Sequence, residues 1–219
     1  MVGSVVERTP MNIRPVTKDD LEAVGQVAYA TGFFGQSAAH YFKDANLFRD
    51  IWVRSYIHGP GCCNYLAEQE GKVVGYIVGT CNQQAHVRYL AFNLFPYVLR
   101  RWARGEYPYW ASSFLHLLRV FRYSRKAAPA QHYPAHLHLN LLPEVRGLGL
   151  GRELLQAYLA CLKARRLPGV QLSTTRENQA AVALYQKLGF KIFAEYESPL
   201  WRPLLGRNVL HLVMVHDLG

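Results

Sequence analysis

A glycine-rich turn is the part of this 219-residue sequence most suited to chemistry. Residues 143–152 have the sequence PEVRGLGLGR, between an alternating, strand-like stretch at 135–142 and the apolar periodicity of a helix at 153–166. Unpaired backbone N–H groups converge at a helix N-terminus, and glycines let an anion approach them closely. The turn therefore predicts a binding site for a ligand that carries phosphate.

The spacing of this turn excludes two common phosphate loops. A Walker loop ends in Gly-Lys-Ser or Gly-Lys-Thr, where this chain has Gly151-Arg152-Glu153. A dinucleotide fingerprint needs glycine at position 152, which is arginine. The pattern that remains is R-x-x-G-x-G, formed by Arg146, Gly149 and Gly151. Taken alone, such a turn could equally be no more than a helix cap.

A second motif favours a ligand-binding turn over a simple helix cap. Residues 178–190 have the sequence NQAAVALYQKLGF and follow a predicted strand at 171–175. Asn178 is suited to cap the helix that this motif forms, and Gly189 to end it. The two motifs, in this order and separation, resemble the hallmarks R-x-x-G-x-G and N-x-x-A-x-x-L-Y-x-K-x-G-F of the GNAT superfamily of N-acetyltransferases.

The resemblance implies an α/β domain over residues 1–219, with a mixed, mostly antiparallel central sheet flanked by helices. It implies acetyl-CoA as co-substrate and transfer of its acetyl group to an amine of a small molecule or protein, by direct attack on the thioester and without a metal. The residues that it places against the coenzyme are Leu141, Leu142, Arg146, Gly147, Leu148, Gly149, Leu150, Gly151, Arg152, Asn178 and Tyr185.

Two residues are candidates for proton transfer. Tyr185 matches the tyrosine of the family motif, and a phenol can protonate the departing thiolate because the two groups have similar pKa values. Residues 135–142 contain no carboxylate, so His138, or its neighbour His136, is the candidate base. The structural alternatives are a packed tyrosine ring and imidazoles that face the other side of the sheet.

A narrower resemblance covers residues 32–50 and 136–144. These stretches are similar to the acetyltransferase-like domain of some O-GlcNAcases and to free-standing bacterial relatives. Where those relatives have an aspartate in the strand, this chain has Asn140, which removes another base. A coenzyme A-binding domain without catalysis is therefore one alternative function.

Residues 82–133 form a predicted helical insertion before the fourth strand. The segment mixes many aromatic residues with eight basic residues and one acid, Glu106, so it carries +7 of the net charge of +10. It could cover the acceptor side as a lid and attract an acidic acceptor, or pack on the domain and make a homodimer contact. A module that binds nucleic acid or a membrane is the remaining alternative, although we expect no nucleic-acid partner. The basic residues are Arg88, Arg100, Arg101, Arg104, Arg119, Arg122, Arg125 and Lys126.

Alternating strand-like and helix-like stretches must position these residues. The four cysteines have no zinc-ligand spacing, and we expect them to be small buried hydrophobes. The sequence shows neither a signal peptide nor a membrane span, which favours a cytoplasmic protein. Strands are predicted at residues 12–16, 63–68, 72–80, 135–142, 171–175, 191–197 and 209–215, and helices at 18–28, 45–57, 112–125, 153–166 and 178–188.

Overall fold

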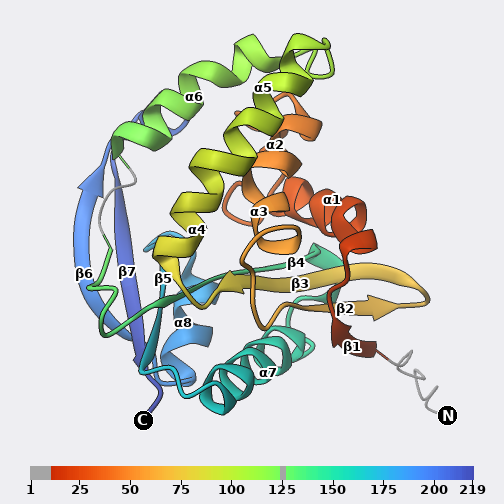
Figure 1. Ribbon diagram of the computed structural model, residues 1–219. Coiled ribbons are helices and arrows are strands. Elements are labelled where there is room, and N and C mark those ends of the chain that lie inside the picture. The colour runs from red at the N-terminus through yellow and green to blue at the C-terminus, as the bar shows by residue number, and fades with distance from the viewer. Residues whose placement is uncertain (1–10, 124–126) are drawn as a thin grey trace, which may run out of the picture.

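A computed structural model describes residues 11–123 and 127–219 (Figure 1). These residues form a seven-stranded sheet in the order β1-β2-β3-β4-β5-β7-β6, in which only the β4–β5 pair is parallel. The mixed, mostly antiparallel sheet predicted from the sequence is confirmed. Arg125 and Lys126, with the N-terminal residues 1–10, lie outside the described residues. The strands are β1 (Met11–Pro15), β2 (Tyr65–Gln69), β3 (Lys72–Thr80), β4 (Ala135–Leu141), β5 (Gly169–Thr175), β6 (Lys191–Ser198) and β7 (Val209–Asp217).

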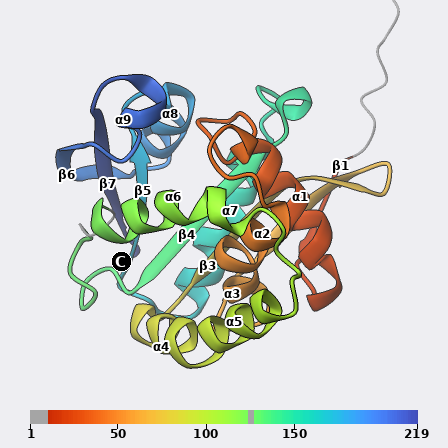
Figure 2. The ribbon, with the colours of Figure 1, turned by 90° about the horizontal axis from the view of Figure 1, so that it is seen from above.

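Helices cover both faces of the sheet (Figures 1 and 2). On one face, α1 (Leu21–Thr31), α2 (Ala45–Trp52) and α3 (Arg54–Ile57) pack on Tyr76 and Val78 of β3. On the other face, α7 (Leu150–Ala164) and α8 (Gln179–Lys187) bury Ile77 and the leucines of β4 and β5. Because both faces are covered, β3 is buried along almost its whole length. The remaining short elements are η1 (Lys18–Asp20), η2 (Ala38–His40), η4 (Pro143–Val145) and α9 (Arg202–Leu205).

The predicted helix over residues 45–57 is interrupted at Val53, which separates α2 from α3. The predicted hairpin turn at residues 70–71 is present, and Glu70 and Gly71 have φ angles of 52° and 73°, as a type I′ turn requires. Helix α7 begins at Leu150, three residues earlier than the sequence indicated, because Gly149 is its N-cap and Gly151 lies within its first turn.

The segment between β3 and β4 contains three helices, α4 (Gln83–Tyr89), α5 (Phe95–Ala103) and α6 (Trp110–Tyr123). Pro96 does not interrupt it, because α4 and α5 run together through the π-helical residues Leu90–Leu94. A proline has no N–H to donate, and the helix widens before it so that Phe95 bonds to the carbonyl of Leu90 instead. We call residues 83–123 the helical segment.

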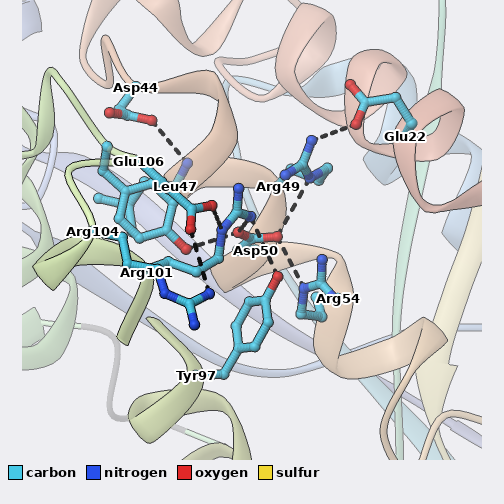
Figure 3. A network of polar contacts seen from close by, with 11 residues as sticks. Glu22, Asp44, Leu47, Arg49, Asp50, Arg54, Tyr97, Arg101, Arg104 and Glu106 are labelled. Carbon is cyan, nitrogen blue, oxygen red and sulfur yellow. Dashed lines mark hydrogen bonds and ion pairs between the residues drawn. The ribbon is translucent and has the colours of Figure 1, made fainter. Parts of the chain in front are cut away.

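A buried carboxylate on α2 fastens the helical segment to the domain (Figure 3). Asp50 is fully buried, accepts hydrogen bonds from Arg54 Nε at 2.9 Å and from the Tyr107 hydroxyl at 2.8 Å, and forms an ion pair with Arg101. Arg101 also bonds to Glu106 at 2.6 Å. This arginine, which the sequence suggested as a charge for attracting a partner, is therefore a structural anchor.

All four cysteines are paired, so the expectation of free buried thiols is wrong. Cys62 bonds to Cys81, at the end of β3, and Cys63 bonds to Cys161 of α7, with Cα–Cα distances of 5.8 Å in both pairs. The partners are 19 and 98 residues apart, a proximity that only the folded sheet creates. Within the described residues, no helix is long and apolar enough to cross a bilayer.

Candidate active site

A cavity of about 1120 Å³ opens where β4 and β5 separate. The two strands pair only at Ala135–Val170 and His136–Gln171 within the described residues, and beyond these pairs both strands line the cavity. Eight of the eleven residues predicted to contact the coenzyme line it, whereas Leu142, Leu148 and Leu150 do not. The eight are Leu141, Arg146, Gly147, Gly149, Gly151, Arg152, Asn178 and Tyr185.

The glycine-rich turn forms a cradle of backbone N–H groups at one end of this cavity. Gly147 and Gly149 have φ angles of 78° and 91°, in the left-handed region that residues with a Cβ rarely adopt. Among the described residues, the N–H groups of Leu148, Gly149, Leu150 and Gly151 have no hydrogen-bond acceptor. Such N–H groups at the start of α7, a 15-residue helix, provide a site for an anion.

The Arg146 guanidinium makes hydrogen bonds within the protein. Its guanidinium donates to the Leu141 carbonyl at 2.9 and 3.1 Å and to the Gly35 carbonyl at 2.7 Å. It therefore ties the end of β4 to the loop after α1, across the mouth of the cavity. A ligand contact by this guanidinium would compete with these bonds.

Backbone groups of β4 also face the gap between the strands. The Leu142 N–H donates to the Val74 carbonyl of β3 at 2.9 Å. Because neighbouring residues of a strand point their backbone groups in opposite directions, Leu139 and Leu141 turn theirs toward β5. The end of β4 thus offers the Leu141 N–H as a donor, whereas the N–H of Leu142, which was also predicted to lie against the coenzyme, is occupied.

Tyr185 of α8 lies beside this gap. Its side chain is 5% exposed, lines the cavity, and packs against the Phe190 ring. Burial raises the pKa of Tyr185 above the usual value for a phenol, so the hydroxyl carries its proton at neutral pH. Asn178 occupies the position before α8 but makes no capping hydrogen bond, which corrects the expected cap and leaves its amide beside the cavity.

His138 points to the α1 and α2 side of the sheet, opposite α7. It lies in register with Val78 of β3, lines the cavity, and its Nε2 is 3.1 Å from the Tyr56 hydroxyl. Burial, and then the nearby His86, lower the pKa of His138 to about 4. Its imidazole is therefore neutral at pH 7. His136 is half-buried further along the strand and does not line the cavity; burial, and then the nearby His138 and His86, hold its pKa well below the ordinary value.

Asn140 is held in place on the same side of β4. Its amide nitrogen donates to Thr31 Oγ1 at 2.7 Å, and its oxygen accepts from the Tyr76 hydroxyl at 3.3 Å. These contacts come from α1 and β3, and they fix the amide as a polar wall of the cavity. Because Asn140 carries an amide, it does not add a base to the cavity.

One region of the cavity is lined by aromatic rings that the sequence analysis did not single out. Tyr41, His116 and Trp201 form a cluster with ring centroids 4.3 to 5.2 Å apart. They come from the loop after η2, from α6 and from the loop after β6. No local motif could have identified them, because each lies on a different element. Through His116, the helical segment contributes to this region of the cavity.

The fold and the cavity agree with the comparison with known families. The model of the family described as Acetyltransferase (GNAT) matches residues 28–190, which include both glycine motifs. The chain belongs to the GNAT acetyltransferase family.

Curated relatives match only part of the chain. A mycothiol acetyltransferase of Paenarthrobacter aurescens is 48% identical over 52 residues, which are 24% of this chain and 16% of that protein. The enzyme of the same name from Thermobispora bispora is 54% identical over 48 residues, 22% of this chain and 16% of its own. The match thus spans about a sixth of the length of these relatives.

Solved structures match over nearly the whole chain. The crystal structure of SsHAT has a TM-score of 0.68 and 23% identity, and the match covers 95% of this chain and 98% of the other. The structure of yncA from Salmonella typhimurium, solved with its cofactor acetyl-CoA, has a TM-score of 0.57 and 17% identity, with coverages of 95% and 94%. At these sequence identities, the structural similarity shows that the proteins share this fold.

Proposed function

We propose that this chain transfers the acetyl group of acetyl-CoA to an amine. The observation that carries the proposal is one cavity with three parts: a cradle of free N–H groups, a buried phenol, and a neutral imidazole on the far side of β4. Each part meets one requirement of acyl transfer, and the family places acetyl-CoA as the acyl donor.

The coenzyme is proposed to bind along the glycine-rich turn and the gap between β4 and β5. The N–H groups from Leu148 to Gly151, with the side chain of Arg152, would hold the pyrophosphate. The outward backbone groups of Leu139 would bond to the pantetheine amides as a neighbouring strand does. The cradle is accessible because glycine at 147 and 149 leaves it without side chains.

Acetyl-CoA supplies a thioester whose carbonyl carbon is attacked by the amine, with a C–N bond formed and the C–S bond broken. The Leu141 N–H is positioned to stabilise the oxyanion that develops on this carbonyl. Tyr185 donates its proton to the departing sulfur and regains one from solvent. His138 accepts the proton lost by the attacking nitrogen, and the Tyr56 hydroxyl orients the imidazole.

The low pKa of His138 limits what this base can do. An imidazole with a pKa of about 4 does not deprotonate an alkylammonium ion in solution, because the two pKa values differ by about 6. The acceptor is therefore proposed to enter as a neutral amine and to lose its proton only after attack, when its nitrogen becomes more acidic. An amine of low pKa is the acceptor class that this site favours.

The proposed acceptor carries an apolar or aromatic group next to its amine. Tyr41, His116 and Trp201 line the region of the cavity where it would enter. Among the described residues, the exposed arginines of the helical segment do not line the cavity, and Arg119 donates to the Leu200 carbonyl. We therefore do not carry forward the idea of an acidic acceptor attracted by these arginines.

The experiment measures thiol release from acetyl-CoA across a panel of amines that differ in pKa and in aromatic content. Tyr185→Phe is expected to lower kcat by about 100-fold or more, the typical contribution of a general acid. Tyr158→Phe is the matched control: Tyr158 is equally buried on α7, its hydroxyl donates to the His136 carbonyl, and it lies outside the cavity lining.

Equal thiol release by the native protein and Tyr185→Phe would remove the tyrosine from the mechanism. Acetyl-CoA binding without thiol release from any amine would support the alternative of a coenzyme-binding domain that has lost catalysis. That alternative has one observation in its favour, the absence of a carboxylate from β4.

A further inference from the structure

The helical segment exposes an apolar surface that neither the fold nor the cavity uses. Sixteen large hydrophobic side chains are exposed among the described residues, and eleven of them lie in this segment. On the run from α4 to α5, the exposed side chains Phe92, Phe95, Leu99 and Trp102 recur at intervals of three and four residues. This spacing puts them on one outward stripe of the helix.

Helix α6 continues this surface. Its inward side is formed by Ser113 and His116, whereas Phe114, Leu118 and Phe121 are exposed on the outer side. The α5 and α6 stripes meet at Trp102, whose ring lies 5.5 Å from that of Trp110. Trp110 in turn contacts Phe114. We call the joined stripes the outer apolar face; Figure 1 shows α6 at the top of the molecule, and Figure 2 shows α4 and α5 at the lower edge of the view from above.

Cationic side chains surround the outer apolar face. Arg88 lies one turn before Phe92, Arg122 one turn after Leu118, and Arg100 and Arg104 lie near the end of α5. All four are exposed. The one acid among the described residues of the segment, Glu106, is paired with Arg101 at 2.6 Å and with Arg104 at 3.9 Å. The face therefore combines positive charge with large apolar side chains.

The combination of positive charge and apolar side chains indicates which kind of partner fits the outer apolar face. A second copy of the chain would bring two positively charged faces together, which opposes self-association. Single-stranded nucleic acid would use the aromatic rings for stacking, but it has no use for the exposed aliphatic side chains Leu99, Leu115 and Leu118. An anionic bilayer satisfies both features, because apolar side chains enter the acyl region while arginines and tryptophans lie at the headgroups.

We propose that the outer apolar face docks this protein on the surface of an anionic phospholipid bilayer. The α4–α5 run and α6 lie in the plane of the interface, and the domain remains in water. This proposal is independent of acetyl transfer, since none of the residues of the face contributes to the chemistry proposed for the cavity.

The test is flotation of the full chain with vesicles of phosphatidylcholine alone or mixed with phosphatidylserine. The native protein is expected to float with the anionic vesicles, and less so at high salt. Arg100→Gln/Arg104→Gln should lower the partition coefficient about 25-fold, at about fivefold for each arginine. Lys163→Gln/Arg165→Gln, with the same change of charge at the exposed end of α7, should leave it nearly unchanged.

A second double variant tests the contribution of the apolar side chains to vesicle binding. Phe95→Ser/Leu115→Ser should lower partitioning about tenfold or more, whereas Phe193→Ser, an exposed ring on β6, should not. Thermal melting and thiol release without vesicles should be the same in these variants as in the native protein.

Three results would overturn the proposal. The first is failure of the native protein to float with anionic vesicles. The second is equal loss of flotation in the α5 and α7 charge variants, which would mean that net charge alone acts. The third is a dimer, or a complex with single-stranded DNA, that Phe95→Ser/Leu115→Ser disrupts while vesicle binding is absent.

Discussion

Replacing Asp50 with asparagine tests how the helical segment is held on the domain. The fully buried carboxylate contacts Arg54, Arg101 and Tyr107, so the change removes the negative charge between two guanidinium groups that are 16% and 18% exposed. Removing one partner of a buried ion pair costs about 3–5 kcal/mol. Glu106 continues to pair with Arg101, which favours the lower end of that range.

A loss of about 3 kcal/mol corresponds to a fall in Tm of about 6–12 °C for a chain of this size. Thermal unfolding of Asp50→Asn should show this shift at pH 7. The control is Glu22→Gln, because Glu22 is 62% exposed and its loss leaves the pair between Arg49 and Asp50 in place. Surface pairs contribute about 0–1 kcal/mol, so the control should melt close to the native protein.

The dependence on pH follows from the same contacts. Burial alone would raise the pKa of Asp50, but the Tyr107 hydroxyl and the Arg54 and Arg49 guanidiniums lower it more, so the net shift is downward. A lowered folded-state pKa contributes stability above the unfolded pKa of about 4, which is lost as the pH falls further. The difference between native protein and Asp50→Asn should therefore shrink below pH 4.

Hydrogen exchange locates the effect. In Asp50→Asn, amides of α5 and α6 should exchange faster, while those of α7 and β5 change less, because Arg101 and Tyr107 belong to the helical segment. An unchanged Tm, or a loss equal to that of Glu22→Gln, would refute the anchoring role of Asp50.

Two further substitutions and one pH profile test other parts of the structure. Gly149→Ala should destabilise the protein by about 1–2 kcal/mol in thermal or denaturant unfolding, because φ of 91° is strained for alanine, and normal stability would contradict that conformation. Cys161→Ser should cost about 2–5 kcal/mol by opening a 98-residue loop, and a free thiol on native Cys63 would contradict the pairing. The value of kcat/KM should not change around pH 6.5, because the pKa of His138 is about 4 and that of Tyr185 is raised. Instead, kcat/KM should increase as the pH rises through the pKa of the acceptor amine, where the amine becomes neutral.

The sequence predicted the parts of this protein that follow local rules. The Gly149 turn, the α8 motif with Gly189 at φ 88°, and the strands were all visible as short patterns, because a glycine requirement or an alternating stretch acts over a few residues. The part of the cavity formed by the glycine-rich turn and α8 was therefore largely predictable. Arg146 was found by pattern too, but its contact with Gly35 was not.

Contacts between residues far apart in the chain could not be predicted from the sequence. The pairing of Cys63 with Cys161, the contact of Asp50 with Arg101, and the meeting of Tyr41 with Trp201 each join segments that only the folded sheet brings together. The aromatic cluster of the cavity is built entirely from contacts of this kind. For that reason the sequence could suggest a base on β4 but could not indicate which rings line the cavity.

The most direct test of the account is calorimetric titration of the full chain with acetyl-CoA, in the native protein and in Arg152→Glu. The account predicts binding of one molecule per chain, at least tenfold weaker in Arg152→Glu because the new carboxylate repels the pyrophosphate at the start of α7, and unchanged in the control Arg165→Glu at the far end of the helix. Absence of binding by the native protein, or equal weakening in both variants, would contradict the assignment of residues 146–152 as the coenzyme site.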